Sequence, residues 1–116
     1  MDDDSDTLRL LEFLMASEGY VVQTAEGAEA AMALLYSFTP DAVLMDIRLP
    51  GMDGLQLTRL LKLTGKAKRV PILAVSASDT AVTIEEAYEA GCDGYITKPV
   101  DSHTFASTVR QYLDRD

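Results

Sequence analysis

Three residues that could carry out chemistry stand directly after short apolar segments of this sequence. Asp46, Ser76 and Lys98 each follow a run with the composition of a buried strand, and an acidic run occupies positions 2–4 before the first predicted helix. In open α/β sheets the ligand crevice lies beyond the carboxyl ends of the strands. We therefore expect a carboxylate, a hydroxyl and an amine to meet at one edge of a sheet, close to further carboxylates.

Such a cluster suits phosphoryl chemistry assisted by a cation. Two carboxylates about 4 Å apart repel each other by roughly 4 kcal/mol at the dielectric of a protein surface, so a positive ion is implied. Oxygen ligands without histidine or cysteine favour Mg²⁺, with Mn²⁺ as an alternative. The Asp46 carboxylate could then attack phosphorus, with Lys98 and Ser76 holding the phosphoryl oxygens. Taken singly, Asp46 is more simply a turn cap, Ser76 a strand end and Lys98 a surface charge. Only their combination favours phosphoryl chemistry.

The elements that would position this cluster alternate between helices and strands. Apolar residues at helical spacing are separated by short β-prone runs, and Gly19 and Gly91 are predicted to stop the helices before them. This alternation predicts an α/β fold with a doubly wound parallel sheet. The first expected helix is capped by Ser5 or Asp6 and stopped by Gly19, and two more span residues 28–38 and 55–63. Asp79 or Thr80 is expected to cap a helix that ends at Ala90, and Asp101 or Ser102 is expected to cap the last one, which ends at Leu113. The expected strands span residues 20–23, 42–46, 70–75 and 95–97.

Composition narrows the class of protein. A chain of 116 residues with 47% hydrophobic content predicts one domain, residues 1–116. Its net charge of −9 argues against direct contact with nucleic acid or an anionic membrane. No apolar run approaches the ~18 residues of a membrane span. The lone cysteine, Cys92, is expected to be a packing residue in a reducing compartment, so we expect a cytoplasmic protein.

Several segments of the sequence together resemble the receiver domain of bacterial two-component response regulators. They read "DDDSDTLRLLEFL", "GY", "PDAVLMDIRLPGMDG", "VPILAVSAS" and "AGCDGYITKPV", and they cover almost the whole chain. Ser76 lies 30 positions after Asp46, and Lys98 lies 22 positions after Ser76, as in that family. The resemblance implies a flavodoxin-like receiver fold with the strand order 2-1-3-4-5.

The resemblance also implies roles for individual residues. Asp46 would accept a phosphoryl group from the phosphohistidine of a sensor histidine kinase or a phosphotransfer protein, and Lys98 would bind the phosphate. Ser76 and Tyr95 would form the switch pair. The chain would not be an enzyme beyond its own phosphorylation and autodephosphorylation. A downstream effector would read the surface built from about residues 80–90, 95–97 and 102–113.

The resemblance further implies a magnesium site. Asp2 and Asp3 would form the acidic pair, together with Asp46 and the backbone carbonyl of Arg48. The pair could instead be Asp3 and Asp4. We prefer Asp2 and Asp3 because the family's distance to the Gly-Tyr after the first helix is then kept.

The sequence departs from the family pattern at its start. A receiver begins with a strand of about five apolar residues, central in the sheet, whereas here only Met1 precedes the acids. Two readings remain open: the sequence is truncated at its start, or open strand edges pair with another copy. On the second reading we expect a homodimer.

Two other classes of function compete with phosphotransfer. A receiver-like scaffold could act by protein contacts alone, with phosphotransfer impaired or lost. A flavin- or nucleotide-binding domain could share the architecture, but no glycine-rich phosphate loop follows any predicted strand. The phosphate-accepting receiver is therefore the leading prediction.

Overall fold

The computed structural model describes residues 5–46, 54–63, 70–77, 80–98 and 100–113. From the first strand onward, strands and helices alternate, as the sequence predicted. The elements are α1 (Ser5–Ala16), α2 (Ala28–Ser37), β1 (Val43–Asp46), α3 (Gly54–Leu63), β2 (Ile72–Ser76), α4 (Ala81–Ala90), β3 (Gly94–Thr97) and α5 (Phe105–Leu113). None of the described helices is long and apolar enough to cross a membrane.

The described strands form a parallel sheet in the order β1-β2-β3. Asp46 is opposite Val75 in the first pairing, and Ser76 is opposite Thr97 in the second. Every residue of the middle strand, β2, is buried. A strand covered on both faces needs apolar residues at every position, which explains the continuous apolar run read from the sequence.

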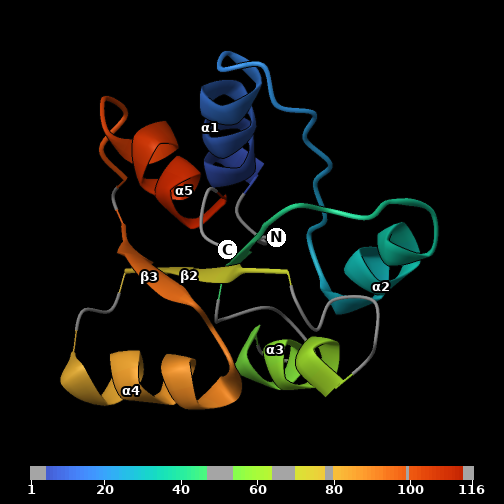
Figure 1. Ribbon diagram of the computed structural model, residues 1–116, viewed down its shortest axis with the longest axis vertical. Helices are drawn as coiled ribbons and strands as arrows, with labels where there is room; N and C mark the ends of the chain where they lie inside the picture. The colour runs from blue at the N-terminus through green and yellow to red at the C-terminus, as the bar shows by residue number, and fades with distance from the viewer. Residues whose placement is uncertain (1–4, 47–53, 64–69, 78–79, 99, 114–116) are drawn as a thin grey trace.

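Helices cover both faces of the sheet. Figure 1 shows α1 and α5 on one face and α3 and α4 on the other. Successive side chains of a strand point to opposite faces, and β2 follows this rule: Leu73 packs with α1 and α5, whereas Ile72 and Ala74 pack with α3 and α4. The two apolar cores therefore lie on opposite faces of the sheet, and helices pack against it from both sides.

Two glycines end helices as the sequence predicted. Gly19 (φ 93°) and Gly91 (φ 116°) adopt the left-handed conformation that favours glycine after a helix. At the other end of α4, the Thr80 hydroxyl accepts a hydrogen bond from the Thr83 backbone N–H at 3.3 Å. Thr80 is thus the cap of α4, and it is one of the two residues predicted for that role.

The prediction of a strand at Tyr20–Gln23 is wrong. These residues lie outside the sheet. Their side chains still alternate, because Tyr20 and Val22 pack against the α1–α5 core while Val21 is 78% exposed. Among the described residues, no strand pairs with this segment. The alternating pattern was real, but alternation alone does not supply a hydrogen-bonding neighbour.

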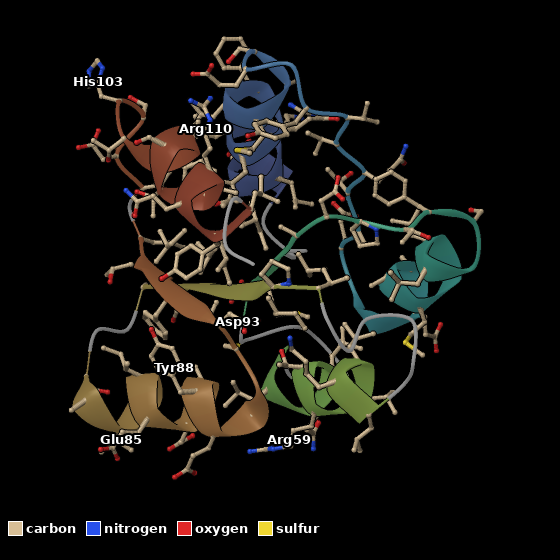
Figure 2. All side chains as sticks on the ribbon, viewed as in Figure 1. Arg59, Glu85, Tyr88, Asp93, His103 and Arg110 are labelled. Atoms are coloured by element: carbon tan, nitrogen blue, oxygen red, sulfur yellow. The ribbon has the colours of Figure 1, made fainter. Side chains whose placement is uncertain are left out.

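The last helix begins three residues later than predicted. Residues 101–104 form a turn, and α5 starts at Phe105. The Asp101 carboxylate accepts a hydrogen bond from the His103 backbone N–H at 2.8 Å, and the Asp101 carbonyl accepts one from the Phe105 N–H at 2.9 Å. Asp101 thus caps a turn that leads into the helix. His103 is exposed (Figure 2), as expected of a surface residue.

Candidate functional site

The structure brings Asp46, Ser76 and Lys98 to one edge of the sheet. Asp46 is the last residue of β1, Ser76 is the last residue of β2, and Lys98 directly follows β3. The backbone N–H of Lys98 donates to the Ser76 carbonyl at 2.7 Å, which continues the ladder by one step. The predicted juxtaposition of these residues is therefore confirmed.

A lysine and a carboxylate face each other at this edge. The Nζ atom of Lys98 lies 3.4 Å from Oδ2 of Asp46, and their side chains are 21% and 10% exposed. This distance exceeds the ~2.7–2.9 Å of a strong charge-assisted hydrogen bond, so the attraction is chiefly electrostatic. Screening by water is reduced at such low exposure. The amine therefore holds a positive charge beside a carboxylate oxygen of Asp46.

The two predicted switch residues lie on neighbouring strands. Ser76 is 3% exposed at the end of β2. Tyr95 lies on β3, two residues before the Cα partner of Ser76, and it is half-buried against the core formed with α3 and α4. Ser76 and Tyr95 therefore lie on directly paired strands.

One residue at this edge was missed by sequence reasoning. Thr97 is the Cα partner of Ser76, immediately precedes Lys98 and is exposed. Its hydroxyl thus stands at the same carboxyl edge. Threonine is common in strands, so its type carried no signal. Its place directly before Lys98 could have drawn attention to it.

The predicted metal ligands other than Asp46 lie outside the described residues. These are Asp2, Asp3 and Arg48, and the alternative ligand Asp4 also lies there. In the part of the chain that the structure describes, no three His, Cys, Asp or Glu side chains are grouped so as to hold a metal ion. Asp46 supplies one hard oxygen donor of the type that Mg²⁺ prefers.

Cys92 lies before β3, at the opposite end of that strand from Lys98. It is 5% exposed, and its Sγ lies 3.9 Å from Oγ1 of Thr58 on α3. Burial raises the pKa of the Cys92 thiol, and the hydrogen bond with Thr58 opposes this shift. The thiol therefore packs in the core, as the sequence predicted.

Comparison with known proteins gives a family match along most of the chain. The family model described as the response regulator receiver domain matches residues 1–110. The polar-differentiation response regulator DivK of Brucella anthropi is 33% identical over 114 residues, which cover 97% of this chain and 92% of that protein.

Solved structures agree with this match. A candidate response regulator from Chloroflexus aurantiacus superposes with a TM-score of 0.93 at 31% identity, covering 99% of this chain and 94% of the other. The receiver domain of a sensor histidine kinase from Pseudomonas aeruginosa superposes with a TM-score of 0.89 at 27% identity, with the same coverage. In that second structure a magnesium ion is coordinated in the active site cleft.

Proposed function

Because this chain belongs to the response regulator receiver domain family, a family of two-component signalling proteins, we propose that Asp46 is its phosphoryl acceptor. The observation that carries the proposal is the Lys98 amine 3.4 Å from the Asp46 carboxylate, beside Ser76. A carboxylate at low exposure is a better nucleophile than a fully hydrated one, and the amine is placed to meet phosphoryl oxygens.

In the proposed reaction one bond forms and one bond breaks. An oxygen of Asp46 attacks the phosphorus of a phosphohistidine on a sensor kinase or a phosphotransfer protein. The phosphorus–nitrogen bond breaks, the imidazole leaves with its electron pair, and an acyl phosphate remains on Asp46. Lys98 would offset the added negative charge, and the hydroxyl of Ser76, the last residue of β2, would donate to a phosphoryl oxygen.

We propose that Mg²⁺ supplies the remaining positive charge. Asp46 would hold it together with the predicted ligands Asp2, Asp3 and the carbonyl of Arg48. The oxygen donor set favours Mg²⁺, with Mn²⁺ as a substitute. When bound, the ion would neutralise charge that Lys98 alone leaves uncompensated.

Phosphorylation of the purified chain tests this proposal. The protein is incubated with acetyl phosphate and Mg²⁺, and intact mass is followed with time. We expect one added phosphoryl group in the native chain and none in Asp46→Asn. The matched control is Asp41→Asn, an exposed aspartate just before β1, which should accept the phosphoryl group as the native chain does.

The outcome also separates the competing function. A folded chain that gains no mass, or that gains it equally in Asp46→Asn, contradicts phosphotransfer at Asp46. In that case a receiver-like scaffold acting through protein contacts becomes the better account.

We further propose that phosphorylation is read at the surface of α4, β3 and α5 through Ser76 and Tyr95. Support comes from direct strand pairing between β2 and β3 and from the half-buried position of Tyr95. Beryllium fluoride, which mimics an acyl phosphate, should shift amide NMR signals of β3 and α4 more than those of α2. Equal small shifts throughout would contradict this route.

Four expectations remain predictions. The chain is expected to be a single cytoplasmic domain that contacts no nucleic acid or membrane directly, and cell fractionation tests its location. A homodimer is expected if an open strand edge recruits another copy. Light scattering of the purified chain measures its mass directly.

A further inference from the structure

The phenol of Tyr112 lies directly against the backbone of β3. Tyr112 is on α5 and is half-buried against the core that α5 forms with α1. Gly94, the first residue of β3, is buried, and a Cβ built on it would lie 2.5 Å from both Cζ and Oη of Tyr112. The tyrosine therefore occupies the space that a side chain at position 94 would fill, and a glycine in the strand permits this close approach.

This contact adjoins the proposed switch residue Tyr95 on the same strand. Successive side chains of a strand point to opposite faces of the sheet. Tyr95 packs with the core formed by α3 and α4, whereas Tyr112 packs with the core of α1 and α5. Figure 1 shows β3 between α4 and α5. A displacement of β3 at Tyr95 would therefore also displace the backbone that Tyr112 touches.

The Tyr112 phenol is also close to α4. Burial raises the pKa of the Tyr88 phenol, and the Tyr112 and Cys92 side chains raise it further. Tyr88 lies on α4 and is 48% exposed. An effect of Tyr112 on the charge of Tyr88 requires the two phenols to be near each other. Tyr112 thus lies where α4, β3 and α5 meet.

We propose that Tyr112 transmits a displacement of β3 to α5, so that phosphorylation moves α5 as well as α4. This inference rests on the proposed phosphorylation of Asp46, and it names the contact through which α5 responds. Close-packed protein interiors transmit strain. At Gly94 no side chain lies between the strand backbone and the ring to absorb the movement. Tyr112 is a positioning residue, because Gly94 lies at the opposite end of β3 from Lys98.

NMR of the folded chain with beryllium fluoride and Mg²⁺ tests the proposal. In the native chain this mimic of an acyl phosphate should shift amide signals of β3, α4 and α5. In Tyr112→Leu the shifts in α5 should fall at least about twofold, whereas those in β3 and α4 should remain. Tyr112→Phe keeps the ring against Gly94 and should retain the response of α5.

The matched control is Tyr20→Leu. Tyr20 is another half-buried tyrosine of the core between α1 and α5, and it lies outside the sheet. Its replacement removes the same ring from the same core, so the response of α5 should persist. Circular dichroism checks that each variant is folded. Both leucine variants should still gain one phosphoryl group from acetyl phosphate, measured by intact mass, because neither tyrosine is proposed to bind that group.

The failure of this inference can be told apart from failure of the proposed function. Undiminished α5 shifts in Tyr112→Leu would overturn the role of Tyr112 alone, as would a native chain in which β3 responds and α5 does not. An equal loss in Tyr20→Leu would overturn it too, because general loosening of the core would then explain the result. Equal losses in Tyr112→Phe and Tyr112→Leu would refute transmission through the ring. A folded native chain that neither responds to beryllium fluoride nor gains mass from acetyl phosphate would contradict the proposed function, and this inference with it.

Discussion

The carboxylate of Asp93 connects the start of β2 to the end of α3. Its Oδ2 atom accepts a hydrogen bond from the Ile72 backbone N–H at 2.9 Å and another from Lys62 Nζ at 3.0 Å. The same Nζ donates to the Val70 carbonyl at 2.8 Å. Figure 2 shows Asp93 between the sheet and the helices α3 and α4. Replacing Asp93 therefore tests which of the two bonds matters for stability.

The two bonds differ in what their loss costs. Ile72 is fully buried, so Asp93→Ala leaves its N–H without this acceptor, which costs about 1–3 kcal/mol. The ion pair is partly exposed, at 20% for Lys62 and 40% for Asp93, and such pairs contribute about 0–1 kcal/mol. In Asp93→Asn the amide oxygen can still accept from Ile72. We therefore expect the unfolding free energy to fall by about 2 kcal/mol in Asp93→Ala and by under about 1 kcal/mol in Asp93→Asn.

Urea and thermal unfolding followed by circular dichroism measure this difference. For a domain of this size, 2 kcal/mol corresponds to a fall in Tm of roughly 6 to 12 °C. High salt should reduce the gap between the native chain and Asp93→Asn, because it screens the ion pair. High salt should not change the difference in unfolding free energy between Asp93→Ala and Asp93→Asn. Equal losses in both variants would refute the reasoning, since the charge and not the buried N–H would then dominate.

Three further substitutions or treatments test other contacts. Lys98→Ala removes the positive charge 3.4 Å from Asp46 and should slow phosphorylation by acetyl phosphate roughly ten- to hundredfold, measured by intact mass, whereas an unchanged rate would contradict its role. Gly94→Ala would place a Cβ 2.5 Å from the Tyr112 ring and should cost about 1–3 kcal/mol in urea unfolding, but clearly less in a Tyr112→Leu background. Burial raises the pKa of the Cys92 thiol and so favours its neutral form, and the stability that this burial contributes is lost as pH rises through the pKa of the folded chain. Iodoacetamide should therefore react slowly with the folded chain and quickly with the chain in urea, and equal rates would contradict this.

Much of the fold could be predicted because most elements are specified by their own residues. β2 is an apolar run at every position, and Thr80 and Gly91 supply the start and stop of α4. The carboxyl-edge residues followed from the same logic, since each stands at the end of such a strand. Asp46, Ser76 and Lys98 could therefore be placed together from the sequence alone.

The errors arose where a segment depends on a neighbour. Tyr20–Gln23 has the alternation of a strand, but a strand also requires a partner backbone, which sequence pattern does not reveal. The late start of α5 depends on which backbone N–H the Asp101 carboxylate binds, and capping residues compete closely at such positions. Both errors concern hydrogen-bonding partners, whereas the apolar pattern itself was read correctly.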